Sequence, residues 1–108
     1  MRVLGYDQTE TGPRLRKTLV DINGITPQIV RSDIGGLMVS GGGAVPKIDI
    51  YTYTRPSNGQ QVWFVECEEF YPPDAIVYSS WLLDEAPTDE QCRDIVATRP
   101  GVGAEAAA

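Results

Sequence analysis

Two pairs of adjacent carboxylates are the residues of this chain best suited by type and spacing to acid–base chemistry. They are Glu68 with Glu69 and Asp84 with Glu85. A glycosidase needs two carboxylates that flank a cleft at a set separation, whereas adjacent residues of a strand point to opposite faces of its sheet. If the strand that contains Glu66 continues to residue 69, Glu66 and Glu68 lie on one face of the sheet and Glu69 lies on the other. The spacing therefore favours solvent-exposed charge over a catalytic pair.

Other common catalytic and ligand groups are scarce. Histidine is absent, which removes the commonest general base and the commonest transition-metal ligand. Cys67 and Cys92 lack C-x-x-C spacing and neighbouring ligand residues, so we expect small buried side chains, with a disulfide or a reactive thiol as the alternative. The calcium-loop pattern of acidic residues is also missing. We expect no catalytic residue, metal site or cofactor, and hence a protein that is not an enzyme.

A glycine-rich stretch, SDIGGLMVSGGGAVP, covers residues 32–46. A phosphate-binding loop needs Lys followed by Ser or Thr after its last glycine, or a G-x-G-x-x-G that opens a helix. Here AVPK follows, so we interpret the glycines as turns around a short strand at 37–39, or as a flexible arm. If this segment is a flexible arm, its residues Gly41, Gly42 and Gly43 would contact a partner.

Charge is distributed unevenly along the chain. Residues 1–65 carry a net charge of +2, whereas residues 66–94 carry −8, and the whole chain carries −6. This balance disfavours nucleic-acid binding, which depends on Lys and Arg side chains that neutralise phosphates. The acidic segment is either a solvated face or a docking surface for a basic partner. Its predicted partner-binding residues are Glu66, Glu68, Glu69, Asp84 and Glu85.

The elements that must position these residues are mostly strands, because apolar residues alternate with period two. The first half of the chain predicts a short strand over 1–6 and a polar loop or arm over 7–14. An Asn-Gly pair at 23–24 predicts a hairpin over 17–30. Pro27 places the returning strand at an edge of the sheet or at a bulge.

The clearest element is a hairpin over 47–67, in which two alternating runs flank a Pro-Ser-Asn-Gly turn. Both faces of this hairpin carry bulky residues, so one packs on the core and the other is covered by a helix or by a neighbour. Tyr51, Tyr53 and Trp63 are its predicted partner-binding residues. A small molecule in the mouth of a barrel is an alternative ligand for these three rings.

The C-terminal half also predicts a strand over 75–83 and one helix over about 89–98. Thr88 is a good N-cap, and Gln91 completes a capping box. Cys92, Ile95 and Val96 form a narrow apolar stripe that lies on the sheet.

Together these elements predict an α+β fold: a mainly antiparallel sheet or small open barrel of six or seven strands with one C-terminal helix. Residues 1–100 form a single domain, and residues 101–108 form a tail of small residues. The chain has no apolar run of membrane-spanning length and no signal-peptide core at its N-terminus. We therefore expect an intracellular, cytoplasmic protein, or one incorporated in a particle assembled there, without membrane contact.

For function we expect a non-enzymatic protein that acts through protein contacts, including self-association into a homo-oligomer. It would work in a multi-chain assembly such as a virion or another repeating structure. The flexible segments, the edge strand with Pro27 and the two bulky faces of the 47–67 hairpin motivate this hypothesis. The alternative is a small acidic inhibitor or accessory protein, of the kind that phages and other mobile elements encode, that docks on a basic host protein.

Overall fold

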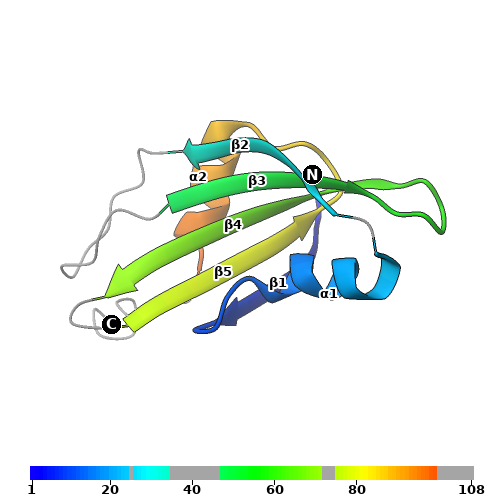
Figure 1. Cartoon of the computed structure of the whole chain (residues 1–108). Coiled ribbons are helices and arrows are strands. Elements are labelled where there is room, and N and C mark those ends of the chain that lie inside the picture. Colours follow the sequence, from blue (N-terminus) through cyan, green and yellow to red (C-terminus); the bar gives the residue numbers. More distant parts are fainter. Residues whose placement is uncertain (25, 35–46, 72–74, 100–108) are drawn as a thin grey trace.

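The structure of the protein is a computed structural model that describes residues 1–24, 26–34, 47–71 and 75–99; side chains are not described at 19–23 and 71. The described chain forms five strands and two helices (Figure 1). In chain order these are β1 (Val3–Thr9), α1 (Arg14–Asn23), β2 (Gln28–Ile34), β3 (Lys47–Thr54), β4 (Gln61–Tyr71), β5 (Ala75–Leu83) and α2 (Asp89–Ala97).

The five strands form one antiparallel sheet in the order β1-β5-β4-β3-β2. This confirms the mainly antiparallel α+β prediction. Two details were wrong: within the described ranges the sheet has five strands rather than six or seven, and a second helix precedes the C-terminal one. The sheet is open, with β1 and β2 as its edges. The strand expected at 37–39 and the tail at 101–108 lie outside the described residues.

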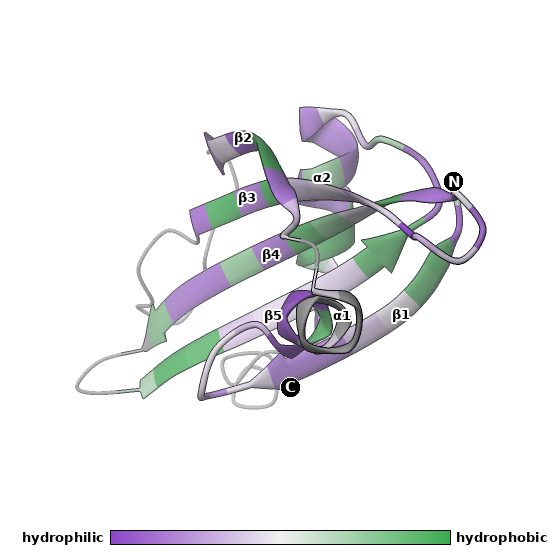
Figure 2. Cartoon of the chain, turned by 45° about the vertical axis from the view of Figure 1, so that its right-hand side comes forward, coloured by the Kyte–Doolittle hydropathy of each residue, from purple (hydrophilic) through white to green (hydrophobic). Residues whose placement is uncertain are grey.

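The predicted 47–67 hairpin is confirmed as β3 and β4. These strands pair without a register shift from Lys47 opposite Glu68 to Thr54 opposite Gln61. The turn is closed by hydrogen bonds between the backbones of Arg55 and Gln60 and of Arg55 and Gly59, each 2.8 Å long. Alternation of hydrophobic and hydrophilic residues along β3 is visible in Figure 2. The hairpin is the part of the fold that local sequence determines most directly.

The hairpin expected over 17–30 is wrong, because its first half is the helix α1. Gly24 follows the last helical residue with φ of +71°. That left-handed conformation ends helices as readily as it forms hairpin turns, so the same Asn-Gly pair serves either role. The loop expected over 7–14 is also shorter than predicted, since β1 continues to Thr9. Pro27 does precede an edge strand, β2, as expected.

The predicted C-terminal helix is confirmed as α2. The backbone N–H of Gln91 donates to Thr88 Oγ1 over 3.1 Å, and the Thr88 N–H donates to Gln91 Oε1 over 2.9 Å. This reciprocal pair is the capping box. The negative charges of Asp89 and Glu90 in the first turn also stabilise the helix, because they lie at the positive end of its dipole.

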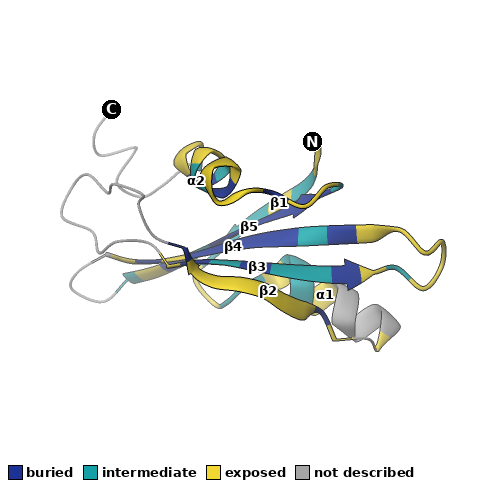
Figure 3. Ribbon diagram, turned by 90° about the horizontal axis from the view of Figure 1, so that it is seen from above, coloured by how far each residue is buried: buried dark blue, intermediate teal, exposed yellow. Residues whose placement is uncertain are grey.

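The two helices lie on opposite faces of the sheet (Figure 3), which we name the α2 face and the α1 face. Cys92 and Val96 of α2 pack on the larger apolar cluster, and Leu15 of α1 packs on the smaller one. The buried members of the α2-face cluster are Ile34, Ile48, Ile50, Val65, Cys67, Trp81, Leu83, Cys92 and Val96. Those of the α1-face cluster are Tyr53, Val62, Phe64 and Leu82.

Candidate functional site

A row of four polar side chains crosses the sheet on the α1 face. In the strand register, Asp49 of β3 lies opposite Glu66 of β4, Glu66 opposite Ser80 of β5, and Ser80 opposite Asp7 of β1. Directly opposed residues of antiparallel strands share a face, with Cβ atoms about 4.5–5.5 Å apart. We call Asp49, Glu66, Ser80 and Asp7 the polar row.

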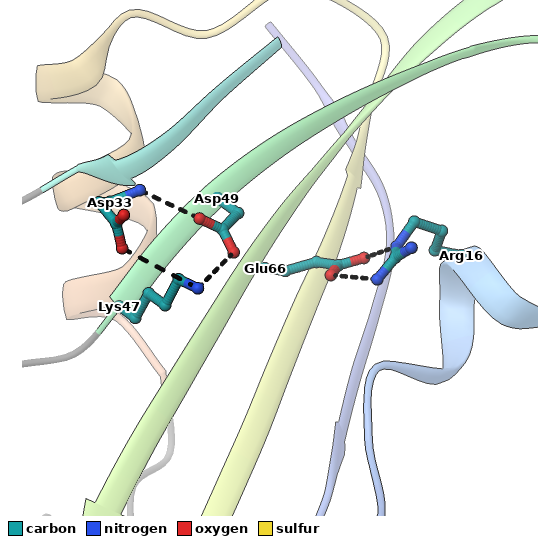
Figure 4. A network of polar contacts seen from close by, with 5 residues as sticks. All are labelled: Arg16, Asp33, Lys47, Asp49 and Glu66. Atoms are coloured by element: carbon teal, nitrogen blue, oxygen red, sulfur yellow. Dashed lines mark hydrogen bonds and ion pairs between the residues drawn. The ribbon is translucent and has the colours of Figure 1, made fainter. Parts of the chain in front are cut away.

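Glu66, in the middle of the polar row, forms a two-pronged ion pair with Arg16 of α1 (Figure 4). Arg16 Nε donates to Glu66 Oε2 over 2.6 Å, and Nη2 donates to Oε1 over 3.1 Å. The guanidinium also lies 4.0 Å from the centre of the Tyr51 ring. Burial raises the pKa of Glu66 above its usual range, although the hydrogen bonds from Arg16 oppose this shift. The pair fastens α1 to the sheet.

Asp49, at the β3 end of the polar row, is also compensated. Its Oδ1 accepts a hydrogen bond of 3.1 Å from the backbone N–H of Asp33. Lys47 Nζ lies 4.0 Å from a carboxylate oxygen of Asp33 and 4.0 Å from one of Asp49 (Figure 4). A hollow of about 240 Å³ lies over this end of the row. Its lining includes Pro13, Arg16, Lys47, Asp49, Tyr51, Glu66, Glu68 and Tyr78.

The β1 end of the polar row is different, because it holds two buried polar atoms without a hydrogen-bond partner. These atoms are Ser80 Oγ and Asp7 Oδ2. Ser80 is 1% exposed, and it lies directly opposite Asp7 in the register. Buried polar groups are nearly always hydrogen-bonded, so this end of the row is chemically incomplete.

The outer strand at this end, β1, has one register shift, between Val3 and Gly5, and forms a regular sheet edge beyond it. Its residues from Gly5 to Thr9 pair with β5 one after another without a register shift. Tyr6, on the α2 face, is 39% exposed, and its ring centre lies 5.0 Å from that of Trp81. Partial burial raises the pKa of Tyr6, which stays a neutral phenol at physiological pH. Val3, opposite Leu83 on the same face, is 49% exposed.

The other edge strand, β2, is irregular. Its pairing with β3 shifts register twice, between Ile29 and Arg31 and again between Arg31 and Ile34. Arg31 ties the strand to the start of α2 through a 2.7 Å ion pair with Asp89. Ile29 and Val30 are exposed. Bulges twist an edge away from regular pairing, so β2, with two register shifts, is the better protected edge, and the unshifted Gly5–Thr9 part of β1 is the more receptive one.

The acidic residues predicted to bind a partner do not form one surface. Glu66 and Glu69 are buried on opposite faces of β4, so the expectation that they belong to an exposed acidic face is wrong. Glu69 is 1% exposed and lies on the α2 face. Its two carboxylate oxygens accept hydrogen bonds from Nε and Nη2 of Arg99. Glu68 is exposed on the α1 face.

The remaining predicted residues are scattered as well. Asp84 accepts a 2.6 Å hydrogen bond from the backbone N–H of Arg2, and Glu85 lies 3.6 Å from the N-terminal ammonium. Gly41, Gly42 and Gly43 lie outside the described residues. The predicted binding role therefore stays a prediction for these residues and for Glu68.

The three predicted aromatic contacts are divided between the faces of the sheet. Tyr53 is buried in the α1-face cluster and Tyr51 packs at its margin, whereas Trp63 packs against the α2-face cluster. Because the sheet is open, these rings do not line a common barrel mouth. Their role in binding a partner stays a prediction.

Neither cysteine is placed for nucleophilic chemistry. Both are buried and free, as the sequence predicted, and burial raises the pKa of Cys67 to about 12 and that of Cys92 to about 11. Within the described ranges, no three His, Cys, Asp or Glu side chains gather closely enough to hold a metal ion. Neither described helix is long and apolar enough to cross a bilayer.

Comparison of the chain with protein-family models, with curated proteins and with solved structures finds no match. Sequence reasoning missed Asp7, Ser80 and Arg16. No local pattern marks Asp7 or Ser80, because each has a polar neighbour in its strand, Gln8 and Ser79 respectively, and only the strand order places the two residues side by side.

Proposed function

We propose that the protein is a non-enzymatic interaction or structural accessory protein of a multi-chain assembly, in the cytoplasm or in a particle formed there. In this proposal the edge strand β1 accepts an extended segment of another protein chain. The regular Gly5–Thr9 edge of β1, together with the exposed β1 side chains of Tyr6 and, beyond the register shift, Val3, is the observation that carries the proposal.

The physical basis is strand addition. The outer backbone groups of an edge strand hydrogen-bond an incoming strand, and side chains on either face supply specificity. Along β1 the pairing register is even over five residues, Gly5 to Thr9, so an added strand finds a regular template. Val3 and Tyr6 add apolar area on the α2 face that such a strand would cover.

Matched lysine substitutions at the two edges test this proposal. Val3→Lys places a charge on β1, and Val30→Lys places the same charge on β2 at a similar exposure, 49% against 44%. We expect extended peptides selected from a random display library on the unmodified protein to lose binding to Val3→Lys and keep it to Val30→Lys. Equal binding to both variants, or no selectable peptide, would contradict a docking role for β1.

Light scattering over a wide concentration range, at low and high salt, tests whether another copy of the chain is a partner. An oligomer that persists at high salt is expected if copies associate through apolar contacts, because salt screens exposed charges over about 10 Å at 0.1 M. The same Val3→Lys and Val30→Lys variants then report whether β1 forms that contact.

The acidic-inhibitor alternative retains one supporting observation. Glu85, Asp89, Glu90 and Asp94 are exposed around α2, although Asp89 is shared with Arg31. This function predicts a monomer that binds a basic protein and releases it as ionic strength rises. Asp94→Asn with Glu90→Gln should weaken such binding, whereas Val3→Lys should leave it unchanged.

A further inference from the structure

We infer that the strand accepted by β1 belongs to a partner protein and carries a Lys or Arg side chain opposite Asp7, with an apolar residue next to it opposite Tyr6. This inference rests on the proposed docking role of β1 and specifies the chemistry of the partner.

The first basis is the incomplete β1 end of the polar row. Ser80 Oγ, on a residue that is 1% exposed, and Asp7 Oδ2 are both buried without a hydrogen-bond partner. The two side chains are directly opposed in the register, so they belong to one small polar site. A carboxylate can only accept hydrogen bonds, and a side chain that donates several would satisfy it.

The second basis is position. In an antiparallel strand added to β1, the residue opposite Asp7 projects from the same face, with its Cβ about 4.5–5.5 Å from that of Asp7. A Lys or Arg side chain spans this distance easily, and Arg can bind a carboxylate through two parallel N–H groups. Arg16 already binds Glu66 in this way, two strands further into the sheet.

The third basis is charge complementarity along the row. Its three carboxylates are Asp49, Glu66 and Asp7. Glu66 is paired with Arg16 and Asp49 lies near Lys47, whereas Asp7 has no cation among its described contacts. The end that lacks a cation is the end at the open edge, so a cation from an added strand would complete the pattern.

A second copy of β1 is a poor source for that cation. The strand reads VLGYDQT and contains neither Lys nor Arg. Antiparallel pairing of two β1 strands centred on Asp7 would oppose two carboxylates, which is destabilising. The other edge strand, β2, does carry a basic residue, Arg31, but that side chain is already bound by Asp89 and by the Pro87 carbonyl oxygen. We therefore assign the occupant to a partner that presents a basic residue in an extended stretch.

The α2 face sets the neighbouring position. The partner residue next to the cation points to the opposite face, beside the partly exposed ring of Tyr6 and its neighbour Trp81. Apolar or aromatic side chains fit there. The expected partner segment thus alternates a basic residue with apolar ones.

The test is a peptide-display selection from a random library on the unmodified protein, on Asp7→Asn and on Asp7→Lys, with Asp94→Asn as the exposed-carboxylate control. Peptides that depend on β1, identified by their loss with Val3→Lys, should be enriched in Lys or Arg flanked by apolar residues. Asp7→Asn should weaken their binding by about tenfold to a hundredfold, from the usual strength of hydrogen bonds to charged groups. Asp94→Asn should not.

Asp7→Lys should reverse the preference toward Asp or Glu, which a merely destabilised protein cannot do. β1-dependent peptides without a basic preference, or with the same preference in Asp7→Asn, would overturn this inference and leave the docking role of β1 standing. Failure to select any β1-dependent peptide would overturn both.

Discussion

Each face of the sheet contains a buried ion pair, but the two pairs differ in how far they are exposed and in what surrounds them. On each, a buried glutamate of β4 is bound by an arginine from outside the sheet: Glu66 by Arg16 on the α1 face, and Glu69 by Arg99 on the α2 face. The two carboxylates are three residues apart and therefore point in opposite directions. Arg16 is 30% exposed at its side chain, whereas Arg99 is 11% exposed.

The surroundings of the two pairs differ as well. The Glu69 pair closes one end of a compact apolar layer under α2, and Arg99 also donates to the Val96 carbonyl oxygen over 2.9 Å. The Glu66 pair lies within a row of polar groups that continues to an open edge. The comparison indicates that the α2 face is built for stability, whereas the α1 face keeps polar groups that packing does not require.

The largest effect is expected from Glu69→Ala. It leaves the nearly buried Arg99 charge without its carboxylate, and breaking a buried pair from one side costs about 3–5 kcal/mol. Urea unfolding measures the loss. The double variant Glu69→Ala, Arg99→Ala should be less destabilised than the sum of the single variants. Additive losses would mean that the two groups do not act as a pair.

A smaller loss, about 1.5–3 kcal/mol, is expected from Glu66→Ala. Arg16 can turn toward water when its partner is removed, because it is already partly exposed. The same urea experiment compares both variants, and hydrogen exchange should show faster opening of α1 than of α2. A loss as large as that for Glu69→Ala would abolish the distinction between the faces.

The smallest effect is a difference in pH dependence between the unmodified protein and Glu66→Gln. Because burial raises the pKa of Glu66 in the folded protein above its ordinary value of 4.5, the folded state keeps the proton to higher pH than the unfolded chain does. The contribution of Glu66 to the free energy of unfolding is therefore greatest below pH 4.5. It falls as pH rises through the folded pKa.

Relative to Glu66→Gln, the unmodified protein should thus lose stability as pH increases from about 4.5, as measured by urea unfolding in a pH series. Glu68→Gln, which removes an exposed carboxylate from the same strand and face, is the matched control. If the unmodified protein instead gained stability relative to Glu66→Gln as pH rises from about 4.5, the sign would be opposite and would contradict a raised pKa.

Sequence reasoning succeeded where local patterns decide the structure. The β3–β4 hairpin has two strand-like runs around a turn sequence, and its strands pair without a register shift, while α2 has a capping box that leaves few alternatives. It failed at α1, where Asn-Gly at 23–24 suits a hairpin and a helix end equally. Apolar residues at 15, 19 and 22 had the spacing of a helix, but branched residues between them favoured a strand.

The candidate site depends on contacts that no local pattern contains. The opposite orientations of Glu66 and Glu69 follow from their odd spacing, but their arginines come from positions 50 residues earlier and 30 residues later. The adjacency of Asp7 and Ser80 likewise depends on β1 returning to the edge of the sheet beside β5. Strand order supplies this information, and the sequence of a single chain does not state it.

The odd spacing of the two β4 carboxylates also constrains how this chain can evolve. A one-residue insertion or deletion between Glu66 and Glu69 would turn one of them to the other's face, since side chains alternate along a strand. One arginine would then lack its carboxylate, and one face would hold two buried negative charges. Descendants of this sequence can vary the exposed Glu68, but the number of residues between the two glutamates is expected to stay fixed.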